Sequence, residues 1–157
     1  LFRSMLGEEI YMKYIAYGSN MIEEQMAYRC PDARLIGVGY LPGYQLEFYL
    51  HATVEYSKIK GTHVPVAVWE ISAGDEQRLD RYEGYPGYYI KEECTVRMAD
   101  GSEIKGMIYL MHAKHNSPPS MGYYEGIRRA YEVLGQNCEI QTVLEPALRR
   151  SIARKQC

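Results

Sequence analysis

Five consecutive residues, Tyr17-Gly18-Ser19-Asn20-Met21, could form a ligand-binding loop. They follow a short apolar run, residues 13–17, that is typical of a β-strand, and they precede a segment with helical signals. The first backbone N–H groups of a helix have no internal partner, so a junction of this kind can hold a carboxylate or a developing oxyanion. The same residues can also form an ordinary turn with an asparagine cap and no ligand. The loop alone leaves both interpretations open.

Glu83 is the second candidate for chemistry. It stands four residues after Leu79, so on a helix it would continue an apolar face. The end of a helix and partial burial among aromatic rings both raise the pKa of a carboxyl group, which suits a general base near neutral pH. The alternative is a surface glutamate that points to solvent. The neighbouring tyrosines that favour the first interpretation are Tyr82, Tyr85, Tyr88 and Tyr89.

Other common catalytic patterns find little support. Proline residues after His112 and His115 favour a loop, which argues against a zinc site. No Gly-Lys-Ser/Thr follows Gly18, and no Gly-x-Ser-x-Gly surrounds Ser19, so neither a P-loop nor a hydrolase nucleophile is indicated. The cysteines are too far apart for a zinc knuckle or a disulfide framework, and we expect reduced thiols at Cys30, Cys94, Cys138 and Cys157.

Length and charge favour one domain that acts on a small molecule. A chain of 157 residues can bury a core without staples, and a formal charge of −2 without charged runs gives no footprint for nucleic acid. No apolar run could cross a bilayer and no signal peptide is visible, so we expect a cytoplasmic protein without a membrane partner. Because Met12 could be a chain start, we predict a single domain over residues 12–157 and a leader or added segment over residues 1–11.

The aromatic composition is unusual, with sixteen tyrosines, two phenylalanines and one tryptophan. A tyrosine ring is largely apolar, but its hydroxyl group needs a partner. A tyrosine-rich interior can therefore line a cavity that is apolar along its walls and polar at chosen points. Interior strands and amphipathic surface account equally well for most of these residues.

The remaining pattern predicts an α+β domain built on a largely antiparallel sheet or a small barrel, because strands occur in neighbouring runs. A helix should start at Asn20 as N-cap, with Glu23 completing a capping box. Two strands joined by a turn are expected over residues 33–50, a weaker strand over 52–56 and a strongly apolar strand over 63–72. A helix should follow over 73–84, and then a hairpin over 88–112 around Ala99-Asp100-Gly101-Ser102. A helix over residues 120–135 would bury Tyr123 or Tyr124, Ile127, Tyr131 and Leu134, and a last helix would start near 138, with a fresh turn at Pro146.

Three motifs in this order, YIAYGSNM (14–21), LDRYEGYPGYY (79–89) and NSPPSMGYY (116–124), resemble the γ-glutamylcyclotransferase-like family over residues 13–134. The resemblance implies a small mixed β-barrel with flanking helices. It also implies a cyclotransferase of the acyltransferase or lyase class, which cleaves a γ-glutamyl amide by internal cyclisation. The products would be 5-oxoproline and an amino acid or amine, and no metal or organic cofactor would be used.

The resemblance also suggests the site residues. Tyr17, Gly18, Ser19, Asn20 and Met21 match the loop whose amides hold the glutamyl group, and Glu83 matches the catalytic acid/base. Tyr89 and Tyr123 match tyrosines that line the pocket, with Tyr88 and Tyr124 as competitors because insertions could shift the match by one residue. The substrate's α-amine would be the nucleophile, so no serine or cysteine is needed.

Two other functions remain open. A non-catalytic or specialised family member would bind a small γ-acyl metabolite in the same pocket. A tyrosine-rich module that takes a peptide would need a large exposed apolar patch, which the sequence does not suggest. The sequence leaves the leaving group undetermined and allows a monomer or a homodimer.

Overall fold

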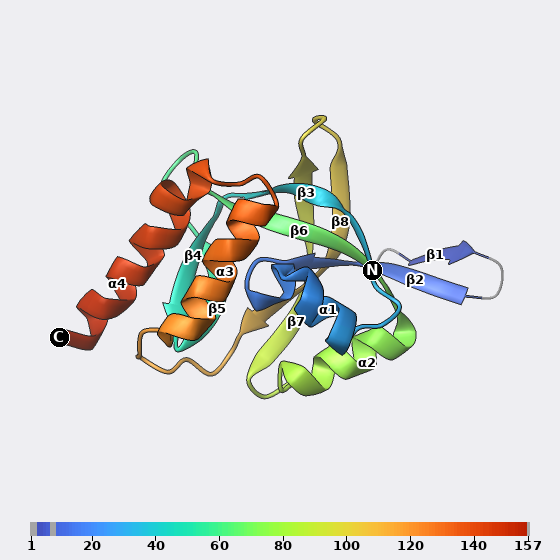
Figure 1. Ribbon diagram of the computed structural model, residues 1–157, viewed down its shortest axis with the longest axis horizontal. Helices are drawn as coiled ribbons and strands as arrows, with labels where there is room; N and C mark the ends of the chain where they lie inside the picture. Colours follow the sequence, from blue (N-terminus) through green and yellow to red (C-terminus); the bar gives the residue numbers. More distant parts are fainter. Residues whose placement is uncertain (1–2, 7–8, 157) are drawn as a thin grey trace.

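The computed structural model describes residues 3–6 and 9–156, and its centre is a closed barrel. The barrel strands follow the order β2 (Glu9–Ala16), β6 (His63–Ser72), β3 (Arg34–Pro42), β7 (Tyr89–Met98) and β8 (Glu103–Met111). Neighbouring strands are antiparallel, except that β2 closes the barrel on β8 in parallel, with Tyr14 opposite Met107. The predicted α+β fold with a mixed, largely antiparallel barrel is confirmed (Figure 1).

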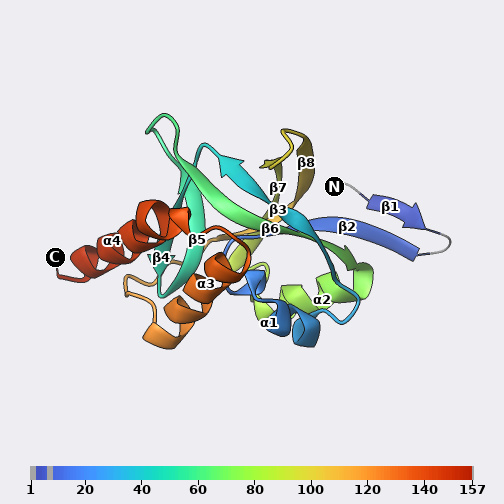
Figure 2. The same ribbon diagram turned by 45° about the horizontal axis from the view of Figure 1, so that its top comes forward.

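Helices and a second small sheet flank the barrel. The strands β4 (Tyr44–Tyr49) and β5 (His51–Tyr56) form a separate antiparallel pair. Figures 1 and 2 show α1 (Glu23–Arg29) beside α2 (Ala73–Tyr82), whereas α3 (Met121–Val133) and α4 (Glu145–Gln156) lie toward the other end, near β4 and β5. The short turns η1 (Ser19–Met21) and η2 (Ile140–Leu144) precede α1 and α4, and β1 (Arg3–Leu6) pairs with β2. None of the helices in the described part of the chain has the length and apolarity needed to cross a membrane.

The strand β6 shows why the apolar pattern predicts this core. It pairs with β2 on one side and β3 on the other, and its residues from Val64 to Ile71 are all buried. A strand covered on both faces is expected to carry a continuous apolar run instead of an alternating one. The run predicted at residues 63–72 therefore marks the centre of the fold.

Most other predicted elements are confirmed. The turn at residues 99–102 joins β7 to β8, with Gly101 at a φ of 86°. The helix α2 starts with a capping box between Ser72 and Asp75. The helix α3 buries Tyr124, Ile127 and Tyr131. The strand β2 begins at Glu9, inside the segment assigned to a leader, and the domain limits stay a prediction.

The prediction that Asn20 caps a helix is wrong. The helix α1 starts at Glu23 with Ile22 as N-cap and without a side-chain cap, while residues 19–21 form a separate 3₁₀ turn. The side chain of Asn20 is unavailable as a cap because it hydrogen-bonds to groups of the pocket described below. The tertiary contacts of Asn20 therefore outweigh the helix-capping preference of the local Asn-x-x-Glu pattern.

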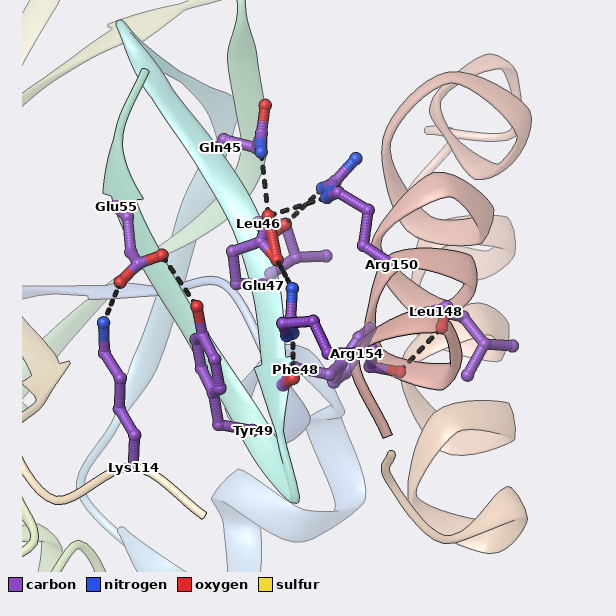
Figure 3. Close-up of polar contacts among 11 residues, drawn as sticks. Gln45, Leu46, Glu47, Phe48, Tyr49, Glu55, Lys114, Leu148, Arg150 and Arg154 are labelled. Carbon is purple, nitrogen blue, oxygen red and sulfur yellow. Dashed lines mark hydrogen bonds and ion pairs between the residues drawn. The ribbon is translucent and has the colours of Figure 1, made fainter. Parts of the chain in front are cut away.

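The helix α4 is held against β4 by a buried carboxylate. Glu47, only 4% exposed, accepts hydrogen bonds from Arg150 Nε at 2.7 Å and Arg154 Nη1 at 2.9 Å. The same arginines donate to the carbonyl oxygens of Leu46 and Phe48 (Figure 3). A buried charge needs partners of this kind, because removing one of them leaves the charge poorly compensated.

We predict that Arg154→Met destabilises the protein by about 1.5–3 kcal/mol, because hydrogen bonds to a buried charged group are lost. Urea denaturation measures the free energy of unfolding. The matched control is Arg149→Met, since Arg149 lies on the same helix with a side chain that is 67% exposed, and it should stay within about 0.5 kcal/mol of the wild type. Equal stability of both variants would show that the contacts of Arg154 do not hold α4.

Candidate active site

A pocket of about 220 Å³ opens where β2 and β5 meet the end of α2 and the start of α3. It gathers the predicted loop residues Tyr17, Gly18, Ser19 and Asn20 around Glu83. Most of its remaining wall is aromatic. The tyrosines that line it are Tyr14, Tyr17, Tyr82, Tyr88, Tyr89, Tyr109 and Tyr123.

The loop offers three amides to a ligand. Within the described residues, the backbone N–H groups of Gly18, Ser19 and Asn20 donate to no protein acceptor. The amide of Met21 differs, because it donates to Gly18 O at 3.0 Å, and the Met21 side chain is buried in the core. The structure thus places Met21 beneath the loop and outside the pocket lining.

Gly18 is needed for space. A Cβ atom at this position would lie 3.3 Å from Ala52 Cβ and 3.5 Å from Tyr123 Oη. Close approach of neighbouring side chains is therefore one constraint that favours glycine here. A larger residue would push the loop away from β5 and α3.

Glu83 faces the loop from the end of α2. Its amide donates to Leu79 O at 2.8 Å, which extends the helix by one residue and fixes the backbone below the carboxylate. Burial raises the pKa of Glu83 from 4.5 to about 7, against smaller lowering effects of Arg29 and of the hydrogen bond from Asn20. Near neutral pH this group exchanges readily between carboxylate and acid.

The side chain of Asn20 connects the barrel to Glu83. Its Nδ2 donates to Tyr14 Oη at 2.8 Å and to Glu83 Oε1 at 3.2 Å. Its Oδ1 accepts from Arg29 Nη1 at 2.7 Å, which fixes the orientation of the amide. Trp69 Nε1 donates to the carbonyl oxygen of Asn20 at 3.0 Å and anchors the backbone. Asn20 therefore shares its amino group between the Tyr14 hydroxyl and the Glu83 carboxylate.

Ala52 on β5 links two of the predicted tyrosines to the pocket wall. Tyr89 Oη donates to Ala52 O at 2.7 Å, and Ala52 N donates to Tyr123 Oη at 3.1 Å. As an acceptor, the Tyr123 hydroxyl keeps its own hydrogen for a ligand, and burial raises its pKa well above the ordinary range. Tyr88 lines the pocket beside Tyr89, whereas Tyr124 packs against Phe48 with ring centres 6.0 Å apart and lies outside the lining.

Sequence reasoning missed several lining residues, among them Gln25, Arg29 and His51. His51 Nδ1 lies 2.8 Å from Tyr88 Oη, and burial, together with nearby His115, lowers the pKa of His51. Gln25 and Arg29 reach the pocket from α1, directly after the loop, and His51 reaches it from the start of β5; no local pattern marks any of the three. Among the described residues, no group of three or more His, Cys, Asp or Glu side chains could hold a metal ion. That His112 and His115 bind no metal stays a prediction.

Comparison with known proteins gives consistent relatives. A family model described as "Gamma-glutamyl cyclotransferase, AIG2-like" matches residues 14–126. Proteins named gamma-glutamylcyclotransferase from Bos taurus and Homo sapiens are each 29% identical to this chain, over 90% and 88% of it and over 80% and 79% of their own lengths. A solved structure titled "Gamma-glutamyl cyclotransferase" superposes with a TM-score of 0.77 at 30% identity and covers 86% of each chain.

The pKa of Glu83 predicts an unusual effect of pH on stability. With a pKa near 7 in the folded state against 4.5 ordinarily, the folded protein retains a proton that the unfolded chain loses between these values. Stability is therefore lost as the pH rises through this window, by at most about 3 kcal/mol. Glu83→Gln keeps an acceptor for Asn20 and carries no charge. We therefore predict that this variant is more stable than the wild type at pH 8, and that its gain in stability is much smaller at pH 5.

Urea denaturation at pH 5 and pH 8 measures this difference. The control is Glu125→Gln, an exposed residue of α3, which should match the wild type at both values. A Glu83→Gln protein that is no more stable than the wild type at pH 8 would show that burial of this carboxylate carries no cost.

Proposed function

The chain belongs to the gamma-glutamyl cyclotransferase, AIG2-like family, and we propose that it cleaves a γ-glutamyl amide by attack of the substrate's α-amine on its own γ-carbonyl. The products would be 5-oxoproline and an amino acid or amine. One observation carries the proposal: a carboxyl group with a pKa of about 7 faces the same pocket as three unused loop amides.

Glu83 would move the proton. The α-amine of a glutamyl group is protonated at neutral pH and cannot attack until it loses a proton. The carboxylate form of Glu83 accepts that proton, the free amine forms the new C–N bond, and a tetrahedral intermediate results. The acid form of Glu83 then gives its proton to the departing nitrogen, the old C–N bond breaks and the carboxylate returns. The ring nitrogen loses its second proton to the released amine, so the products are the neutral lactam and an ammonium ion.

The loop would hold the negative charge that develops in this reaction. The amides of Gly18, Ser19 and Asn20 are suited to bind either the oxyanion formed at the γ-carbonyl or the substrate's α-carboxylate. The free hydrogen of the Tyr123 hydroxyl, which lies beside Gly18, adds a fourth donor. These groups are fixed before the substrate arrives, so they need little reorganisation during the reaction.

The pocket would also fold the substrate. Closing a five-membered ring requires the flexible glutamyl chain to bring its amine to its own carbonyl, and a narrow pocket with tyrosine walls favours that geometry. In this mechanism the substrate supplies the nucleophile and Glu83 handles the proton. No step then requires a metal or an organic cofactor. Burial raises the pKa of the Cys30 thiol to about 12, so this cysteine supplies no thiolate.

We predict that Glu83→Gln lowers the rate of 5-oxoproline release by about 10²–10⁴-fold, because a neutral amide cannot accept the proton of the amine. Mass spectrometry over a panel of γ-glutamyl amino acids and amines measures release. Glu125→Gln serves again as control and should retain activity. Full activity of Glu83→Gln would show that Glu83 has no part in the mechanism. Binding of these compounds by the wild-type protein without turnover would instead identify a specialised binding protein.

The pH dependence gives an independent test. Only the carboxylate form of Glu83 accepts a proton, so log kcat/KM should rise with pH and level off above an apparent pKa near 7. The profile is measured by initial rates in buffers of constant ionic strength. An acidic limb near 4.5 would mean that a carboxyl group in water, and not the buried Glu83, limits the reaction.

A further inference from the structure

A second cavity adjoins the proposed active site and shares part of its wall. This open cavity of about 560 Å³ is lined by Tyr28, Arg29, Arg78, Arg81 and Tyr82, and we name it the arginine groove. Arg29 and Tyr82 also line the catalytic pocket. A ligand that fills the pocket at Glu83 can therefore extend past these two side chains into the groove.

The groove carries an excess of positive charge. The guanidinium of Arg78 is paired with buried Asp75 at 2.6 Å and lies 3.7 Å from Asp32. One N–H group of Arg29 donates a hydrogen bond to the neutral side chain of Asn20. Within the described residues, Arg81 lies within 4 Å of no carboxylate. Guanidinium groups with unused N–H donors bind carboxylates strongly and with defined geometry.

Two exposed aromatic rings border these cations. Tyr28 is 80% exposed and Tyr82 is 50% exposed. The guanidinium carbon of Arg29 lies 4.5 Å from the centre of the Tyr82 ring, so stacking holds Arg29 at the boundary between pocket and groove. Exposed tyrosines next to arginines provide apolar contact area beside charged donors, a combination enriched in binding surfaces.

Among the described residues that line the pocket, Arg29 is the only arginine or lysine. His51 and Tyr88 also line the pocket, and His51 is held by its contact with the Tyr88 hydroxyl. The lowered pKa of His51 leaves this imidazole neutral at pH 7. A negatively charged extension of a substrate would therefore find its cations on the side of Arg29.

We propose that the arginine groove is a subsite for the far end of the leaving group, in which Arg81 binds a carboxylate and so determines how strongly free acids are preferred over the uncharged amides of the same γ-glutamyl peptides. This inference rests on the proposed function. The glutamyl group would lie between Glu83 and the loop, the scissile amide would face Arg29 and Tyr82, and the peptide carboxylate would reach Arg81. Charge complementarity selects this occupant over an uncharged amine.

The test uses γ-glutamyl peptides that carry one to three glycines, each as the free acid and as the C-terminal amide. The measured quantity is the ratio of kcat/KM for acid over amide at each length. In the wild type we expect a ratio above about fivefold for at least one length, and Arg81→Gln should reduce it to near one, because a charge-assisted hydrogen bond is lost. The control is Arg149→Gln, which removes the same charge from α4 and should keep the wild-type ratio.

A binding measurement separates this inference from the proposed function. Glu83→Gln protein, with and without Arg81→Gln, is titrated calorimetrically with the same acids and amides. Turnover of acids and amides with equal kcat/KM would show that the arginine groove does not bind the carboxylate, and it would leave the proposed cyclotransferase activity unaffected. If no peptide yields 5-oxoproline, the cyclotransferase proposal fails. The calorimetric titration then tests carboxylate binding by the arginine groove on its own. Tighter binding of acids than of amides that depends on Arg81 supports this binding, and equal binding of acids and amides contradicts it.

Discussion

The hydrogen bond from Asn20 Nδ2 to Glu83 Oε1 is the contact around which the rest of the site is arranged. It joins residues 63 positions apart, one after the end of β2 and the other at the end of α2. The bond can form only because β2 pairs with β6 and α2 follows β6 directly, so that strand pairing brings the two ends together. It also puts a donor beside a carboxylate that burial would otherwise leave poorly compensated.

The position of Asn20 also explains why Glu83 titrates near neutral pH. A direct ion pair with Arg29 would favour the charged form and hold the pKa of Glu83 low. Arg29 instead bonds to the Oδ1 atom of Asn20 at 2.7 Å, so the amide stands between cation and carboxylate, and the charge of Arg29 lowers the pKa of Glu83 from beyond the amide. Burial then outweighs both lowering effects, and the pKa rises to about 7. The group that would do the chemistry therefore also lowers the stability of the fold when it is charged.

The sequence predicts the parts of this arrangement that have local causes. Strands such as residues 63–72, the hairpin turn at Gly101 and the apolar spacing from Leu79 to Glu83 can be recognised because each depends on neighbours in the chain. The role of Asn20 could not be recognised, because its local pattern predicts a helix cap, whereas in the fold its side chain bonds to Tyr14, Arg29 and Glu83, the last of them 63 residues away. His51 reaches the pocket as the first residue of β5, where nothing in the sequence marks a site. The choice between Tyr123 and Tyr124 likewise depends on which face of α3 meets the barrel.

The two ends of the proposed site differ in how firmly they are held. On one wall, both polar backbone atoms of Ala52 are bonded to tyrosines of β7 and α3, while Arg150 and Arg154 fix the neighbouring strand β4 from outside through Glu47. Such double support is what a site needs when it must hold a reacting group in one geometry. On the other side, Tyr28 and Arg81 stand on helix surfaces exposed to solvent. A rigid end suits the constant glutamyl group, and an open, charged end suits leaving groups that vary in length but share a carboxylate.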